Sequence, residues 1–295
     1  MSSVAYPQRA PAGDHRRVAV ETFSALPAPP IRRPAASLVV LGDSAAVGLG
    51  DPLPTGGWRG FGPLLAAALG TPENVYYNNL SDIGARMGDL RRRQLPSALV
   101  LRPDVVVILA GMNDTLRSDF DGGAICNDLA VTVAALQDGG AVVLVTRYHE
   151  HGRVFRLPGP LRRALHHRIE QLNHAVDHVV AERGALCLDL HIMPGAYETA
   201  SWSVDRLHPS ELGHRMLAAG YAGLLAEAGI AVPYSIGRAC SGGRQLTAAH
   251  HIAWLIFRGL PWLARRSRDL LPHAAGLVLR DLLGQRAAVP SRYAR

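Results

Sequence analysis

The sequence contains no lysine, so all 31 of its basic side chains are arginines. Cysteine is also scarce: Cys126, Cys187 and Cys240 are odd in number and far apart in the chain. That pattern excludes a disulfide framework and the closely spaced thiol pair of a zinc site. No apolar run approaches the roughly 18–20 residues of a membrane span, and no apolar segment before Leu38 has the character of a signal peptide. These absences predict a protein of the reducing cytoplasm.

The excess positive charge is confined to one end of the chain. Residues 239–295 carry nine arginines against two aspartates, which accounts for the whole net charge of +7. Residues 1–238 are therefore balanced, and they lack the basic excess that accompanies nucleic-acid binding. We expect no nucleic-acid partner for this larger part of the protein.

Composition divides the chain into three parts. Residues 1–36 are rich in proline, alanine and arginine without hydrophobic periodicity, which predicts a loose N-terminal arm. Residues 37–232 alternate between apolar runs and helical patterns and should form the main domain. Residues 233–295 combine leucine and tryptophan with arginine, which predicts a basic, amphipathic helical extension.

The main domain shows a regular alternation of strand and helix patterns. We expect strands near 38–42, 75–80, 104–110, 141–146 and 185–190, and helices near 61–69, 85–94, 124–137, 160–183 and 209–228. Short apolar strands that alternate with helices indicate a parallel sheet covered on both faces. With right-handed crossovers, this is a three-layer α/β/α sandwich.

A serine follows the first expected strand directly. The apolar run before Gly42-Asp43-Ser44 predicts a tight turn at the carboxyl end of a strand, where open α/β sheets bind their ligands. Serine becomes a nucleophile only when a base takes its proton. Asp205 stands three residues ahead of His208, so its carboxylate can accept from one imidazole nitrogen and leave the other for Ser44. That is the division of roles in a catalytic triad.

Two further residues follow other strands and can stabilise an oxyanion. The side-chain amide of Asn113 comes just after the third strand and can donate a hydrogen bond there. Gly84 comes just after the second strand, and a glycine lets its backbone N–H approach a ligand closely. The backbone N–H of Ser44 would be a third donor.

These motifs resemble the sequence blocks of the SGNH (GDSL-type) hydrolases over residues 38–228. Gly42-Asp43-Ser44, with Gly48 four residues after the serine, is similar to the first block of that family. Asn79–Ala85 is similar to the second, Gly111–Asp114 to the third and Asp205–Pro209 to the fifth. Ala45 stands where many members have leucine, a difference that does not touch the chemistry.

The resemblance implies a flavodoxin-like sheet of strand order 2-1-3-4-5 and hydrolysis of esters or acyl groups without metal or cofactor. It also implies Ser44 as nucleophile, His208 as base and Asp205 as the residue that orients it. By the same resemblance, Gly84 and Asn113 are the oxyanion-hole donors.

The same residues also have structural interpretations. Ser44 can cap the segment that follows it, and Asn113 and Asp114 suit a plain turn after a strand. We expect Asp43 to brace its turn rather than take part in the reaction, and Asp114 to hold the loops of the site together.

The thirteen histidines invite a metal hypothesis. His174 and His178 stand one helical turn apart, but the pattern offers no third ligand and no glutamate of the metalloprotease type. We therefore expect no metal site. His149 and His151 follow the fourth strand and are candidates to line the substrate cleft.

The sequence thus favours a serine esterase that acts on a small-molecule or lipid-like acyl ester and uses no cofactor. An acyltransferase that passes the acyl group to an alcohol or sugar is the alternative. A non-catalytic binding or membrane-scaffold protein on the same fold is a third hypothesis. For residues 240–285 three hypotheses stay open: helices packed on the sandwich, peripheral contact with a membrane through residues 250–285, and a partner-binding or lid element.

Overall fold

The structure is a computed structural model, and it describes residues 33–155, 159–241 and 275–276. The expected arm over residues 1–36, apart from 33–36, lies outside the described residues. So do the expected helices of residues 250–285, apart from 275–276. None of the helices that the structure describes is long and apolar enough to cross a membrane.

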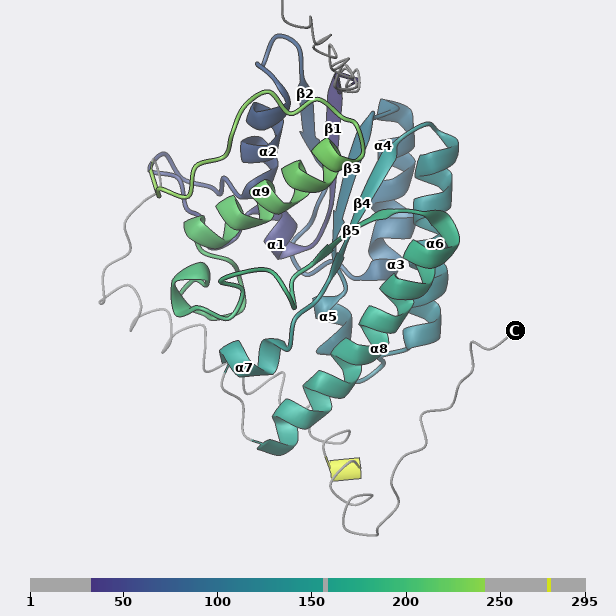
Figure 1. Cartoon of the computed structure of the whole chain (residues 1–295). Coiled ribbons are helices and arrows are strands. Elements are labelled where there is room, and N and C mark those ends of the chain that lie inside the picture. The colour runs from purple at the N-terminus through teal and green to yellow at the C-terminus, as the bar shows by residue number, and fades with distance from the viewer. Residues whose placement is uncertain (1–32, 156–158, 242–274, 277–295) are drawn as a thin grey trace, which may run out of the picture. The chain divides into compact units, whose positions relative to one another are not determined.

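A five-stranded parallel sheet forms the centre of the described chain (Figure 1). Its order is β2-β1-β3-β4-β5, so the expected fold class is confirmed. The strands are β1 (Ser37–Gly42), β2 (Tyr76–Asn79), β3 (Val105–Leu109), β4 (Val142–Arg147) and β5 (Leu186–Asp189).

Burial explains why these apolar runs pair in this order. All five residues of β3, a valine-rich run, are buried, and β1 beside it is buried from Leu38 to Gly42. Fully burying one such aliphatic side chain stabilises the fold by about 1.5–3 kcal/mol. β2 lies at the edge and consists of tyrosine and asparagine, which tolerate exposure there.

Helices cover both faces of the sheet (Figure 1). One face carries α2 (Phe61–Leu69) and α9 (Glu211–Glu227), which pack together. The other face carries α3 (Met87–Asp89), the π turn η1 (Leu90–Gln94) and α4 (Leu95–Leu101), which follow one another without a break. It also carries α6 (Gly122–Asp138) and α8 (Gly159–Arg183).

Four short elements complete the described secondary structure, and each follows a strand. They are α1 (Ser44–Val47), α5 (Met112–Thr115), α7 (His151–Phe155) and the 3-10 turn η2 (Thr199–Ser201). The sequence did not predict any of the four, because one helical turn is too short to show a hydrophobic period.

Two expected helix boundaries are wrong. The helix expected to end at Gln94 continues to Leu101, because the π turn leads into a further helical segment, α4, that is rich in apolar residues. Pro96 fits the first turn of α4, where a missing N–H is tolerated. α9 begins at Glu211 and not at Pro209. Its N-cap is Ser210, whose hydroxyl accepts a hydrogen bond from the N–H of Gly213 at 3.2 Å.

A cluster of ion pairs fixes the start of α9. Asp51, whose side chain is fully buried, accepts from Nε of Arg59 at 2.8 Å. The same guanidinium lies 2.7 Å from Oε1 of Glu211, which also accepts from the backbone N–H of Ser241 at 2.5 Å. Arg215 pairs with Glu211 at 3.0 Å. The loop before α2, the first turn of α9 and the chain near residue 241 are thereby joined.

Candidate active site

The turn that carries Ser44 is set by its two preceding residues. A Cβ at Gly42 would lie 2.2 Å from the carbonyl oxygen of Leu109 on the neighbouring strand, so only glycine fits there. Asp43 then caps α1, because its Oδ1 accepts from the N–H of Ala45 at 3.0 Å. Ser44 is the first residue of α1 rather than its cap, and its hydroxyl is left for other contacts.

Ser44, His208 and Asp205 form a chain of two short hydrogen bonds. Nε2 of His208 lies 2.7 Å from Oγ of Ser44, although 164 positions separate the two residues. Nδ1 of the same imidazole lies 2.7 Å from Oδ2 of Asp205. The structure therefore brings together the three residues that the sequence singled out. An imidazole held in this way can accept the hydroxyl proton through one nitrogen while it donates to the carboxylate through the other.

Hydrogen bonds keep the Asp205 carboxylate charged. Its Oδ1 accepts from the Ser203 hydroxyl at 2.6 Å and from the N–H groups of Leu207 and His208 at 2.8 and 3.0 Å. Burial raises the pKa of Asp205, but the hydrogen bonds and the charge of His208 outweigh it and lower the pKa to about 2. The carboxylate is thus ionised throughout the neutral range and can stabilise a protonated imidazole.

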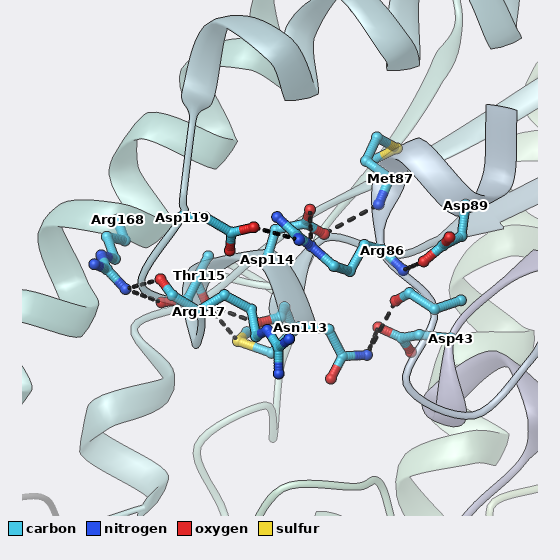
Figure 2. A network of polar contacts seen from close by, with 12 residues as sticks. Asp43, Arg86, Met87, Asp89, Asn113, Asp114, Thr115, Arg117, Asp119 and Arg168 are labelled. Atoms are coloured by element: carbon cyan, nitrogen blue, oxygen red, sulfur yellow. Dashed lines mark hydrogen bonds and ion pairs between the residues drawn. The ribbon is translucent and has the colours of Figure 1, made fainter. Parts of the chain in front are cut away.

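Asn113 lies beside Asp43 at the ends of two neighbouring strands (Figure 2). Its side-chain amide donates to the carbonyl of Ala85 at 3.1 Å and to Oδ2 of Asp43 at 3.4 Å. Burial raises the pKa of Asp43 to about 6, while the hydrogen bond from Ala45 and the charge of His208 act in the opposite direction.

Asp114 links the loop after β2 to α5 (Figure 2). Its carboxylate accepts from Nε of Arg86 at 3.2 Å and from the N–H of Met87 at 3.1 Å. Arg86 also pairs with Asp119 at 2.9 Å. The role expected for Asp114, that of holding the loops of the site together, agrees with these contacts.

Gly84 is placed differently from the other expected residues. It has a φ of +81° in an exposed turn, which closes with a hydrogen bond from the N–H of Ala85 to the carbonyl of Asp82. Gly84 is not among the residues that line the pocket beside Ser44. It stands one residue before Ala85, whose carbonyl anchors the amide of Asn113.

A mostly apolar pocket opens beside Ser44 and His208. Its empty space is about 730 Å³, open solvent at its mouth included. The aliphatic part of its wall includes Leu109, Met112, Leu116, Leu190, Met193 and Leu217. His149 and His151 also line it, as the sequence suggested, together with Tyr148 and Trp202, which sequence reasoning missed. The one available signal for Tyr148 was its position directly after the fourth strand.

The described residues offer no group of three or more side chains that could hold a metal ion. His174 and His178, which lie on α8, are among the described residues. The site itself brings a hydroxyl, an imidazole and a carboxylate into line next to an apolar cavity.

The sequence and the fold were compared with known proteins. The family model of the GDSL-like lipases and acylhydrolases matches residues 40–216. An α/β hydrolase enzyme from the metagenome of Lake Arreo, Spain, is 22% identical with a TM-score of 0.53, over 65% of this chain and 95% of that chain.

Two further solved structures are similar. An acetylxylan esterase from Geobacillus stearothermophilus is 19% identical with a TM-score of 0.53, over 66% of this chain and 95% of that chain. A lipase/acylhydrolase from Enterococcus faecalis is 24% identical with a TM-score of 0.50, over 65% of this chain and 94% of that chain. At such identities the three structures support the fold alone. No curated protein matches the sequence.

Proposed function

The chain belongs to the GDSL-like lipase/acylhydrolase family, and on that premise we propose that it is a serine esterase that cleaves carboxylic esters through an acyl-enzyme on Ser44. One observation carries the proposal: the Ser44 hydroxyl, the His208 imidazole and the Asp205 carboxylate lie in line at 2.7 Å each. The apolar pocket beside Ser44 supplies room for an acyl chain.

In the first half of the reaction, Nε2 of His208 takes the hydroxyl proton as Oγ of Ser44 attacks the ester carbonyl. The carbonyl π electrons move to oxygen and give a tetrahedral oxyanion. Asp205 keeps its negative charge and stabilises the imidazolium. The oxyanion then collapses, the bond to the leaving alcohol breaks, and His208 returns its proton to that alcohol.

In the second half, water takes the place of the alcohol. His208 removes a proton from the water, which attacks the acyl-enzyme, and the second oxyanion collapses to release the carboxylic acid. The Ser44 oxygen recovers its proton from His208. No metal or cofactor is needed in either half.

We assign the oxyanion to the backbone N–H of Ser44 and to the side-chain amide of Asn113. The backbone N–H of Gly84, which lies in an exposed turn outside the pocket lining, is the third donor that the family resemblance implies. The two hydrogen bonds of the Asn113 amide differ in length, 3.1 Å to Ala85 and 3.4 Å to Asp43. The longer one is the weaker. An oxyanion would take the hydrogen that now points to Asp43, while Ala85 keeps the amide in place.

A panel of p-nitrophenyl esters of increasing acyl length tests the proposal. Ser44→Ala should lower kcat/KM by at least about 10³-fold, as removal of a triad member does elsewhere. Ser97→Ala, at an exposed position of α4, is the matched control and should keep full activity. Equal hydrolysis by the wild type and Ser44→Ala would refute the proposal.

An acyltransferase would use the same acyl-enzyme but pass it to an alcohol or a sugar. A cover that excludes water, formed by the helices expected in residues 240–285, would favour this outcome, and those residues lie almost wholly outside the described ones. Product analysis with and without added alcohol separates the two activities. A new ester that forms in preference to the free acid would make the protein a transferase.

We also propose that residues 37–232 are the catalytic domain and that residues 250–285 contact anionic membrane surfaces. The clustered arginines beside leucine and tryptophan support the second point. Co-sedimentation with anionic vesicles should be lost in a chain that ends after Ser241, which keeps the contact between Ser241 and Glu211. Equal sedimentation of both chains would refute membrane contact.

A further inference from the structure

Tyr148 lines the pocket beside Ser44, and its hydroxyl has no hydrogen-bond partner among the residues that the structure describes. The residue follows β4 directly, lines the pocket and is only 6% exposed. None of the hydrogen bonds found among the described residues involves its hydroxyl. A phenol in so apolar a setting ordinarily finds a partner.

The backbone of Tyr148 is held in place from both sides. Its N–H donates to Oδ1 of Asn173 at 2.8 Å, and its carbonyl accepts from Nδ2 of the same side chain at 2.8 Å. Asn173 is itself buried in α8. Tyr148 is therefore fixed before any ligand arrives, which is what a preorganised binding group requires.

His149 adds a second polar atom without a partner. The residue is 1% exposed and lines the same pocket, and its Nε2 lies 3.2 Å from Nδ1 of His151. Its ring packs on Trp202 with the ring centres 4.9 Å apart. Its Nδ1 has no hydrogen-bond partner in the part of the chain that the structure describes. Two neighbouring residues thus leave polar atoms unsatisfied in one apolar wall.

A buried polar atom without a partner, such as Nδ1 of His149, destabilises a fold, and such atoms usually find their partner in water, an ion or a ligand. The ligand group should carry no negative charge, because no arginine lines the pocket and the carboxylates of Asp43 and Asp205 are close to Ser44. The apolar wall disfavours a positive charge as well, so the group should be neutral. Burial also lowers the pKa of His149 well below its usual value, so that imidazole adds no positive charge at neutral pH. A hydroxyl can both donate and accept, so it can satisfy either a phenol or a neutral imidazole.

We propose that Tyr148 and His149 form a polar subsite in the acyl pocket, and that the natural substrates are esters of hydroxy acids. This inference rests on the proposed esterase function. We assign the hydroxyl to the acyl part because that part stays covalently bound to Ser44 through the second half of the reaction, whereas the alcohol departs. A hydroxyl that is held during both halves contributes to both transition states.

The test compares matched pairs of p-nitrophenyl esters: hexanoate against 2-hydroxyhexanoate and 3-hydroxyhexanoate. The wild type should favour at least one hydroxyacyl ester by about tenfold or more in kcat/KM, the effect of one neutral hydrogen bond. Tyr148→Phe should lower that ratio by about tenfold. Tyr221→Phe is the matched control: this buried tyrosine bonds Thr146 and lies outside the pocket lining, so it should leave the ratio unchanged.

Thermal unfolding supplies an independent readout. Tyr148→Phe should not lower the Tm, because the hydroxyl that it removes has no hydrogen-bond partner in the described part of the chain. Tyr221→Phe should lower the Tm, because its hydroxyl lies 2.5 Å from the Thr146 hydroxyl. If Tyr148→Phe lowers the Tm as much as Tyr221→Phe does, the hydroxyl of Tyr148 has a structural partner and the subsite is refuted.

Failure of the subsite can be told from failure of the esterase. If Ser44→Ala abolishes hydrolysis of all three esters but the wild type shows no preference for a hydroxyacyl ester, the subsite is wrong and the esterase stands. If the preference exists but survives in Tyr148→Phe, the subsite is also wrong. If neither the wild type nor Ser44→Ala hydrolyses any ester, both proposals fall.

Discussion

Gln94 and Gly42 bond to each other twice across the interior of the protein. Oε1 of Gln94 accepts from the N–H of Gly42 at 2.8 Å, and Nε2 of Gln94 donates to the carbonyl of Gly42 at 2.9 Å. Gln94 is 5% exposed and lies in the π turn before α4. A side chain from the helical layer thus takes over the backbone hydrogen bonds of β1 at the point where the strand stops and the turn to Ser44 begins.

Gln94→Ala should therefore be costly. It leaves the buried N–H of Gly42 without a partner, which costs about 1–3 kcal/mol, while the carbonyl of Gly42 keeps its hydrogen bond from the N–H of Asp82 at 3.1 Å. We expect the free energy of unfolding to fall by about 2 kcal/mol in urea denaturation. The control is Gln137→Ala on α6, where the amide donates to the carbonyl of Arg183 at an exposed site, and a change within about 0.5 kcal/mol is expected. Equal losses in the two variants would contradict this view of Gln94.

Gly42→Ala should destabilise the protein more than any surface change, because the added Cβ would lie 2.2 Å from Leu109 O and 2.6 Å from the Cβ of Ala46. We expect a loss of more than about 3 kcal/mol, or insoluble protein. Gly223→Ala is the opposite case, since Gly223 lies in the middle of α9 with open space around it. It should raise stability by about 0.5–1 kcal/mol. Thermal melts of both variants check the pair.

Asn113→Ala should slow catalysis while the protein stays folded. If the amide stabilises the oxyanion, its loss should lower kcat by about 10²–10³-fold and change KM little. Asn113→Asp should not rescue the activity, because a carboxylate would add negative charge next to Asp43 and the oxyanion. A variant with unchanged kcat would place Asn113 outside the oxyanion hole.

The buried carboxyl of Asp43 predicts a pH dependence of stability. Its pKa is raised to about 6 in the folded protein from 3.8, so between these values the folded state binds more protons than the unfolded state. Stability from this group is therefore fully present below pH 4 and is lost as the pH rises through 6. Two pKa units correspond to about 3 kcal/mol at most.

Asp43→Asn removes this titration. Relative to the wild type, its free energy of unfolding should rise by up to about 3 kcal/mol between pH 4 and pH 7. Asp138→Asn, at the exposed end of α6, should show no such change. Denaturation curves at a series of pH values measure the difference. A constant gap between Asp43→Asn and the wild type would show that Asp43 titrates normally.

Most of the sheet could be predicted from the sequence because β1, β3, β4 and β5 are mainly apolar runs, whereas β2 consists of tyrosine and asparagine. The helix Phe61–Leu69 was predicted to the residue, since Gly60 and Gly70 stand directly beside it. The helix after β2 was predicted to end too early, at Gln94. A π turn shifts the helical period by one residue, so the hydrophobic pattern no longer indicates the continuation to Leu101.

Contacts of the candidate site could be predicted only where residues of suitable chemistry also stand at a suitable spacing in the sequence. Asp205 and His208 are three residues apart, so their contact could be expected, and the strand ends put Ser44 at the same edge. The hydrogen-bond partners of Asn113 could not be predicted, and neither could the lack of a partner for the Tyr148 hydroxyl among the described residues. Both depend on which side chains from other layers of the fold lie nearby, and the periodicity of the sequence does not encode those contacts.

The 164 positions between Ser44 and His208 have a consequence for how the protein is made. The ribosome completes the nucleophile early, but its proposed base appears only after every strand of the sheet has been synthesised. If Ser44 is activated by His208 as proposed, a nascent chain that has folded only its first strands carries an unactivated serine and cannot attack esters. On the proposed mechanism, activity would begin only when the last strand has joined the sheet and the imidazole has reached its place.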